Sequence, residues 1–144
     1  MASILVVEDE EGVREFLVEC LRDDEHDVES AADGQDGLEK LRRRGFDVLL
    51  TDLKMPRIDG MTLLRTVRTE QPELEVVMLT AHGGVESAIE ATKLGVMEYL
   101  EKPVDSPAAL RLVMRRAAER RRLRTRAEAE RADEPPPLSF GFHI

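Results

Sequence analysis

Three short runs of consecutive apolar residues stand out along the chain, at residues 4–7, 48–50 and 76–79. Continuous apolar runs of this length, rich in branched side chains, are typical of strands covered on both faces. Two weaker strands are expected around Val28 and over residues 97–100. The pattern therefore predicts five strands, of which the three strongly apolar ones are central in a sheet.

Between the predicted strands, apolar residues recur at the three- and four-residue spacing of amphipathic helices. Alternating strands and helices favour an α/β fold, with a parallel sheet, helices on both of its faces and right-handed crossover connections. The residues that carry this spacing are Val13, Phe16, Leu17, Cys20 and Leu21; Leu38 and Leu41; Met61, Leu64 and Val67; Ala88, Ala91 and Leu94.

The carboxyl-terminal segment differs from the rest. Helical sequence continues from Pro107 to about Ala132, a predicted helix of about 25 residues, or ~38 Å. Its first half carries an apolar stripe, whereas the arginine run from Arg115 to Arg122 is interpreted as a solvated helix face. We expect a compact domain over residues 1–120, followed at 121–144 by a helical extension and a proline-rich, disordered tail.

Charge is distributed unevenly along the chain. The 144 residues carry 21 Lys and Arg against 30 Asp and Glu, a formal net charge of -9. From Asp105 onward there are 9 Arg and 6 acidic residues, while the preceding 104 residues hold 12 cations and 24 acids. An acidic body argues against direct binding of nucleic acid by this chain.

No segment reads as a signal peptide or a membrane span. The amino terminus enters a predicted strand almost at once, and no apolar run is long enough to cross a bilayer. The single cysteine, Cys20, leaves no internal disulfide possible. We therefore expect a cytoplasmic protein that does not contact a membrane.

Polar residues follow four of the predicted strands directly. Glu8 and Asp9 come after the first, Asp52 ends the third, Thr80 the fourth, and Lys102 follows the fifth. In an open α/β sheet, ligands bind outside the carboxyl ends of the strands, so these side chains are expected on one rim. Carboxylates held together repel one another unless a cation lies among them, and oxygen ligands with room for water suit Mg²⁺.

The same set of residues predicts phosphoryl chemistry. A carboxylate beside Mg²⁺ can attack phosphorus, and a nearby ammonium and hydroxyl can stabilise the transferring group. Asp52, Lys102 and Thr80 supply these three groups. The predicted catalytic residues are therefore Asp52 as nucleophile, with Thr80 and Lys102 beside it.

With these residues in their order and spacing, the sequence resembles the response-regulator receiver family of two-component signalling. The resemblance covers roughly residues 3 to 120. It implies a flavodoxin-like, doubly wound sheet of five parallel strands in the order 2-1-3-4-5, followed here by an extended carboxyl-terminal helix. The motifs that carry it are Val6-Val7-Glu8-Asp9, Leu50-Thr51-Asp52, Met55-Pro56 with Asp59-Gly60, Thr80-Ala81 and Lys102-Pro103.

The resemblance assigns the metal site and the phosphoacceptor. Asp52 looks like the acceptor and also a metal ligand, Asp9 like a direct ligand, and Glu8 like an acid that holds Mg²⁺ through water. Glu8 departs from the commoner Asp-Asp pair of the family, which leaves its exact geometry open. The backbone carbonyl of Lys54 would complete the protein ligands.

The resemblance also assigns a switch. Thr80 is similar to the hydroxyl residue that turns toward the phosphoryl group, and Tyr99 to the aromatic residue that turns inward with it. For Tyr99 a half-buried strand tyrosine with its hydroxyl in water stays open as an alternative. Lys102 would pair with the phosphoryl group, and the family expectation for Lys102-Pro103 is a cis peptide bond.

A histidine kinase or a phosphotransfer protein is the implied partner, and the receiver modifies only itself, so no external substrate is expected. The implied output surface is the face of the fourth helix, fifth strand and fifth helix, with a homodimer through that face as one possibility. Ala88-Ile89-Glu90-Ala91 and Tyr99-Leu100-Glu101-Lys102-Pro103 resemble receivers of enhancer-binding activators of the nitrogen-regulation class. Transcription is the expected output, through a domain or partner outside this chain.

The extent of the protein and two rival functions stay open. The chain contains no Walker glycine loop and no helix-turn-helix, so it is either a stand-alone regulator or the amino-terminal piece of a longer one. A Mg²⁺-dependent phosphohydrolase would also use an Asp nucleophile, but it would need a second Asp where this chain has Lys54. A phosphorylation-independent interaction module is the other rival, and the intact set of Asp9, Asp52, Thr80 and Lys102 argues against it.

Overall fold

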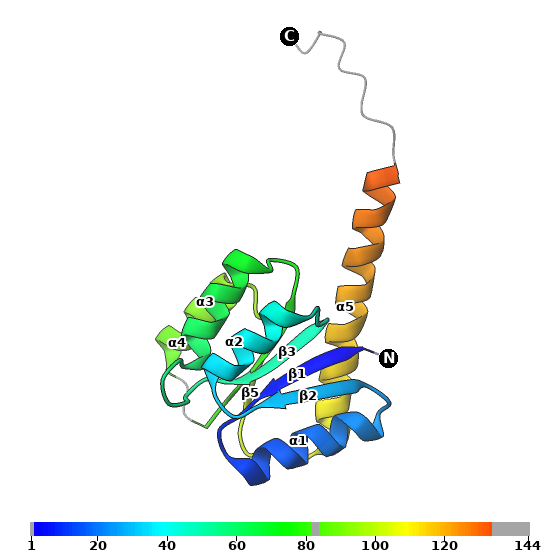
Figure 1. Ribbon diagram of the computed structural model, residues 1–144. Helices are drawn as coiled ribbons and strands as arrows, with labels where there is room; N and C mark the ends of the chain where they lie inside the picture. Colours follow the sequence, from blue (N-terminus) through cyan, green and yellow to red (C-terminus); the bar gives the residue numbers. More distant parts are fainter. Residues whose placement is uncertain (1, 82–83, 134–144) are drawn as a thin grey trace.

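The computed structural model describes residues 2–81 and 84–133, over which strands and helices alternate as predicted (Figure 1). The strands are β1 (Ser3–Val7), β2 (Asp27–Ala31), β3 (Val48–Asp52), β4 (Glu75–Thr80) and β5 (Glu98–Glu101). The helices are α1 (Glu11–Asp23), α2 (Gly34–Arg43), α3 (Gly60–Glu70), α4 (Val85–Lys93) and α5 (Pro107–Asp133).

The five strands form one parallel sheet in the order β2-β1-β3-β4-β5. This confirms the predicted flavodoxin-like, doubly wound architecture. The register pairs Ile4 with Val48 and Leu49 with Val76, so the carboxyl ends of β1, β3 and β4 lie at the same edge of the sheet. The chain order reverses between β1 and β3, which is where ligands bind in such sheets.

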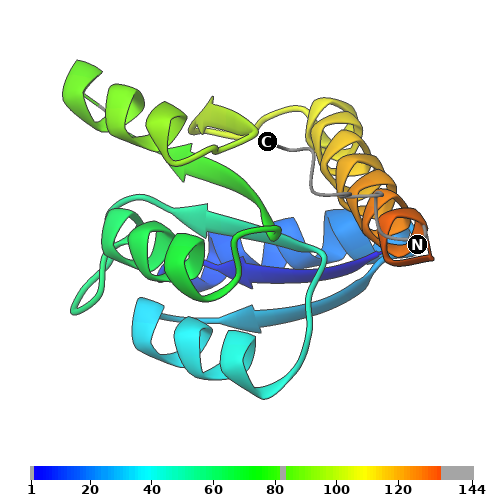
Figure 2. The same ribbon diagram turned by 90° about the horizontal axis from the view of Figure 1, so that it is seen from above.

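Successive side chains along each strand point alternately into two separate apolar layers. Leu5 and Leu49 pack with α2, α3 and α4, whereas Ile4 and Leu50 pack with α1 and α5. Viewed from above, α2, α3 and α4 line one side of the sheet and α5 lies on the other (Figure 2). Both faces of the central strands are therefore covered, which explains why these strands are apolar without alternation.

Helix α5 begins at Pro107 and continues past the end of the sheet (Figure 1). It has 27 residues, close to the predicted length. Its first half packs on the sheet through a buried stripe, as predicted. The members of this stripe are Leu110, Val113, Met114 and Ala117. The proline-rich tail that was expected to be disordered falls within residues 134–144, which lie outside the described residues.

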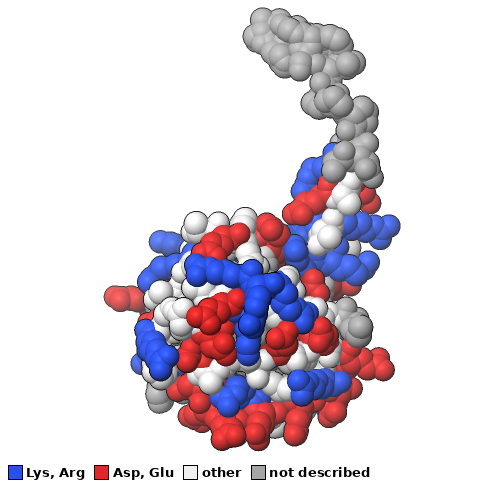
Figure 3. Space-filling model, viewed as in Figure 1, with Lys and Arg blue, Asp and Glu red and all other residues white. Residues whose placement is uncertain are grey.

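The charge asymmetry of the sequence is visible on the surface. Acidic side chains cover the part of the body around α1, and basic side chains are prominent along the extension of α5 (Figure 3). Four acids of α1 face outward, namely Glu11, Glu15, Glu19 and Asp23. Among the described residues, no helix combines the length and the apolar character that crossing a membrane requires.

Candidate phosphorylation site

Four predicted site residues come together at the carboxyl edge of the sheet. Glu8, Asp9 and Asp52 each place a carboxylate oxygen within 4.8 Å of the other two. The Nζ of Lys102 lies 2.5 Å from Glu8 Oε1 and 3.0 Å from Asp52 Oδ2. One ammonium therefore bridges two of the three carboxylates.

Burial differs sharply among the three acids. Glu8 is completely buried and Asp52 nearly so, whereas Asp9 is exposed. Burial raises the pKa of Glu8 from its ordinary value, although the hydrogen bond from Lys102 opposes this change. Burial alone would lower the pKa of Lys102, but its hydrogen bonds to Glu8 and Asp52 outweigh that effect and raise it.

The charges of this cluster do not balance. Three carboxylates face one ammonium, so the ionised site carries an excess of about two negative charges in a partly buried setting. The metal-binding groups that gather here from the described residues are all carboxylate oxygens, and Asp9 leaves the cluster open to solvent. These residues fit a hard divalent cation that keeps several water ligands, as Mg²⁺ does.

The loop after β3 is held close to Asp52 by a glycine. A Cβ at Gly60 would overlap the backbone carbonyl oxygen of Asp52, so only glycine allows this approach. Its N–H donates to the carbonyl of Leu53 at 2.7 Å. Asp59 caps α3 by accepting from the N–H of Thr62 at 2.9 Å, so its carboxylate serves the helix terminus.

Lys54 lies in this loop, two residues beyond Asp52, and its side chain is exposed. The role of its carbonyl as a metal ligand stays a prediction.

The peptide bond between Lys102 and Pro103 is cis. The N–H of Lys102 donates to the carbonyl of Thr80 at 2.8 Å, which ties the end of β5 to the end of β4.

Within the part of the chain that the structure describes, the hydroxyls of the two expected switch residues have no hydrogen-bond partner. Thr80 is 3% exposed, and its Oγ1 has no hydrogen bond to any described residue. The hydroxyl of Tyr99 is likewise buried and unpaired within the described part of the chain, while its ring packs against the layer of α3 and α4. An unpaired buried hydroxyl costs about 1–3 kcal/mol, so both groups are poised to accept a new partner.

Sequence reasoning missed two contributions to the site. Arg14 donates to the backbone carbonyl of Glu8 at 2.9 Å and so holds the acidic pair from α1. Thr51 is fully buried and donates from Oγ1 to the carbonyl of Asp52 at 3.0 Å. Arg14 carried no sequence signal, and Thr51 stood in a motif without a role of its own, because each acts through a backbone carbonyl whose position depends on the folded loop.

Comparison with known proteins shows the family of the chain. Residues 4–114 match the response regulator receiver domain family. The chain belongs to the response-regulator receiver family. The curated relatives of this receiver include the transcriptional regulatory protein GlrR of Escherichia coli, which is 38% identical over 107 residues. That match covers 74% of this chain and 24% of GlrR, so the receiver spans about a quarter of that relative's length.

Solved receiver structures share the whole fold. A receiver domain protein of Clostridium thermocellum superposes with a TM-score of 0.80 at 35% identity, covering 85% of this chain and 98% of that one. The beryllofluoride-activated receiver domain of NtrC4, described as a dimer, gives a TM-score of 0.77 at 30% identity, covering 83% and 98% of the two chains. The receiver identity thus rests on both sequence and fold.

Proposed function

We propose that Asp52 accepts a phosphoryl group and that Mg²⁺ held by Glu8, Asp9 and Asp52 is required for the transfer. The observation that carries the proposal is the position of Asp52, 3.0 Å from the ammonium of Lys102 and inside the acidic cluster. Bound Mg²⁺ would neutralise the excess negative charge and polarise the phosphoryl oxygens. Asp9 would bind it directly, Glu8 through water, and Lys54 through its backbone carbonyl.

The transfer uses the carboxylate of Asp52 as a nucleophile. As its oxygen bonds to phosphorus, the P–N bond of a phosphohistidine donor breaks, and the imidazole nitrogen keeps the electron pair. Lys102 stabilises the charge on the transferring group, and its partner Glu8 keeps it at the site. No external substrate is turned over, because the phosphoryl group stays on Asp52 until water removes it.

The acyl phosphate would act on a two-state switch. A phosphoryl group on Asp52 offers acceptor oxygens to the unpaired hydroxyl of Thr80. Movement of Thr80 then changes the space beside Tyr99, which lies opposite Met78 in the neighbouring strand. The phosphoryl group shifts the equilibrium between the two states of this switch only as far as it stabilises one state more than the other.

A histidine kinase or phosphotransfer protein would dock beside the site. A groove lined by Val13, Phe16, Pro103 and Val104 opens next to Lys102. Phe16 is 37% exposed although it belongs to the apolar spacing of α1. An apolar groove adjacent to the reacting carboxylate suits a helix that presents a phosphohistidine. Such a kinase partner would place this receiver in the cytoplasm.

The output surface would be the face of α4, β5 and α5. Val85, Ile89 and Leu112 expose 76%, 50% and 48% of their surface on α4 and α5. Because the related NtrC4 receiver is described as a dimer when activated, we assign a homodimer through this face to the phosphorylated state. Transcriptional output, as the name of GlrR suggests, would come from a domain or partner outside this chain.

Intact mass spectrometry tests the proposal. Incubation with acetyl phosphate and Mg²⁺ should add ~80 Da, the mass of one phosphoryl group. The addition should disappear in Asp52→Asn and persist in Asp59→Asn, a nearby carboxylate that only caps α3. An unmodified wild-type protein, or equal modification of Asp52→Asn, would refute the assignment.

Two further measurements separate the rival functions. Release of free phosphate from an unrelated phosphoester, well beyond one equivalent, would favour a phosphohydrolase. Sedimentation with and without beryllofluoride tests the dimer, and an unchanged mass would count against it.

A further inference from the structure

Another buried carboxylate lies at the opposite, amino-terminal edge of the sheet, away from Glu8 and Asp52. Glu75 is the first residue of β4 and is completely buried, yet neither of its carboxylate oxygens has a hydrogen bond among the described residues. Its contacts are ion pairs with two residues of α5, 3.1 Å from Arg124 and 3.7 Å from Arg120. A buried carboxylate is costly unless it is paired, so these arginines account for its presence.

On both β4 and α5, apolar side chains give way to charged ones at the amino-terminal edge of the sheet. Along β4, Val77 and Leu79 point into the layer beneath α5, and the alternation of a strand puts Glu75 on that same face. Along α5, the apolar stripe ends at Ala117, and helical spacing continues it through Arg121 and Arg124. The helix therefore becomes basic where the strand becomes acidic.

Other contacts surround this pair. Arg124 also donates to the backbone carbonyl of Glu73 at 3.2 Å. Arg121 lies 4.0 Å from Asp47, the residue before β3. Arg68 of α3 fixes the neighbouring loop by donating to the carbonyl of Leu74 at 2.7 Å. Past Ala118, ion pairs thus replace the apolar contacts that hold the first half of α5.

We propose that Glu75, Arg120 and Arg124 form an ionic latch that fixes the extension of α5 to the receiver and sets the direction in which this helix leaves the body. The latch lies at the edge of the sheet remote from Asp52, and it operates whether or not Asp52 is phosphorylated. Its failure and the failure of the phosphoacceptor assignment are therefore distinguishable.

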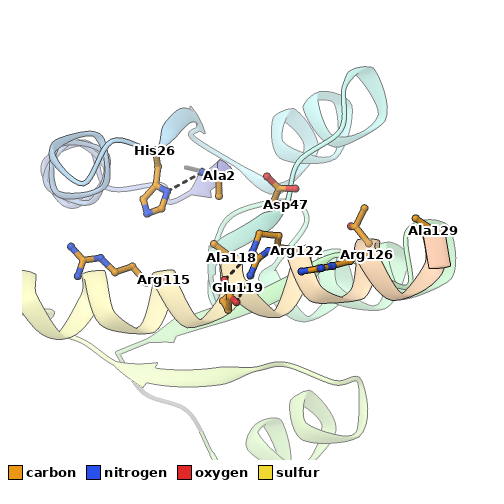
Figure 4. A pocket seen from close by; sticks show the side chains of 10 residues that line it. Ala2, His26, Asp47, Arg115, Ala118, Glu119, Arg122, Arg126 and Ala129 are labelled. Carbon is orange, nitrogen blue, oxygen red and sulfur yellow. Dashed lines mark hydrogen bonds and ion pairs between the residues drawn. The ribbon is translucent and has the colours of Figure 1, made fainter. Parts of the chain in front are cut away.

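The same helix supplies a matched control. Arg122 hydrogen-bonds to Glu119 within α5, at 2.6 and 3.1 Å, and its side chain is 59% exposed (Figure 4). Figure 4 shows Arg122 and Arg126 along the groove between the extension and the edge that carries Ala2, His26 and Asp47. Arg122→Gln removes one charge from the extension without touching the latch.

Hydrogen–deuterium exchange of the full chain tests the latch. In Arg120→Gln/Arg124→Gln, amides of residues 118–130 should exchange at least about tenfold faster than in the wild type, with peptides from β1 and β3 unchanged. Glu75→Gln should speed exchange over the same residues, but by less than the double variant does, because it leaves no buried carboxylate unpaired. Adding the two arginine substitutions to Glu75→Gln should then change the exchange rates little, because both sets of substitutions remove the same interaction.

Three results would overturn the proposal. The first is unchanged exchange over residues 118–130 in both Glu75→Gln and the double arginine variant. The second is an equal loss of protection in Arg122→Gln, which would mean that helix charge alone matters. The third is additive effects of the Glu75 and arginine substitutions, which would mean that they act separately.

Discussion

The two edges of the sheet both bury a carboxylate, but they balance it in opposite ways. At the carboxyl edge, Glu8, Asp9 and Asp52 share a single ammonium from Lys102. At the amino edge, Glu75 alone faces two guanidinium groups. The first edge has a deficit of positive charge and the second has a surplus.

The two edges are suited to different tasks. A deficit of positive charge leaves room for a cation and for a reaction that redistributes charge, as phosphoryl transfer does. A surplus of partly exposed guanidinium groups costs little, because water solvates the charge that the carboxylate does not balance. The amino edge is therefore suited to hold α5, and the carboxyl edge to respond to a ligand.

Substitution of Lys102 should destabilise the protein most. Lys102→Met leaves buried Glu8 and Asp52 without their cation, so we expect the metal-free protein to lose about 3–5 kcal/mol of unfolding free energy. Mg²⁺ should stabilise this variant more than the wild type, since no ammonium competes with it. Urea unfolding with and without Mg²⁺ measures both effects, and Lys93→Met, at an exposed lysine of α4, is the control. Equal stabilisation of wild type and variant by Mg²⁺ would contradict the charge deficit.

At the amino edge the loss of the cations should also cost more stability than the loss of the carboxylate, but the costs are smaller. Arg120→Gln/Arg124→Gln should cost about 1–2 kcal/mol, because it leaves a buried carboxylate but the helix can lift and admit water. Glu75→Gln should cost less than about 1 kcal/mol, since the remaining arginines are 52% and 39% exposed and keep their hydration. Urea unfolding of both variants checks this ranking. A larger cost for Glu75→Gln than for the double variant would be inconsistent with a surplus of cations.

Substitution of Asp9 should change the unfolding free energy by less, and in the opposite direction. Asp9→Asn relieves repulsion among three clustered carboxylates, so the metal-free protein should gain about 1 kcal/mol. The stabilisation that Mg²⁺ confers on the wild type should largely vanish in this variant. Thermal unfolding across a Mg²⁺ titration measures both. A destabilised metal-free variant, or one with full response to Mg²⁺, would argue against Asp9 as a ligand.

The smallest expected effect is the pH dependence set by His26, beside the amino edge. Burial lowers its pKa in the folded protein, and this outweighs the attraction of Asp24. The unfolded chain takes up a proton near pH 6.5, whereas the folded protein does so only at lower pH. Stability should therefore be full above about pH 6.5 and decline, by about 1 kcal/mol or less, as pH falls through the folded pKa.

His26→Gln should flatten this decline. Urea unfolding between about pH 7.5 and 5.5 compares the two slopes. Asp24 contributes to the pH dependence of stability only outside this window, because its hydrogen bond from Arg115 lowers its pKa below the ordinary carboxyl range. A wild-type slope that persists in His26→Gln would assign the proton uptake to another group.

The sheet and its active edge could be predicted from the sequence because both depend on local signals. Apolar runs at residues 4–7 and 48–50 fixed two central strands, and the topology of parallel strands brings their carboxyl ends together. Asp52 and Glu8 follow those runs directly. Their proximity to one another and to Lys102 needed only the strand order, which the family resemblance supplied.

The arginines of α5 show what could not be predicted. Their residue type indicated solvent, and we interpreted the run from Arg115 to Arg122 as a solvated face. Arg122 fits that interpretation, but Arg120 contacts Glu75, and Arg115 forms an ion pair with Asp24. These partners lie far away in the sequence, so the pairing depends on how α5 crosses the sheet and carries no local pattern.

The bridge between Glu8 and Lys102 was missed for a related reason. The resemblance suggested that Glu8 acts on a metal through water, and it paired Lys102 with the phosphoryl group. In the structure Glu8 contacts Lys102 directly, because its longer side chain reaches the ammonium from a fully buried position.

Mapping the phosphoryl group to a single residue is the most direct test of the charge-deficit site. After reaction with acetyl phosphate, borohydride reduction converts an aspartyl phosphate into homoserine, which peptide mass spectrometry can locate. We predict modification at Asp52 alone, dependent on Mg²⁺ and abolished by a chelator. Modification at Asp9 or Glu8, or equal labelling of Asp52 in the presence of the chelator, would contradict the account.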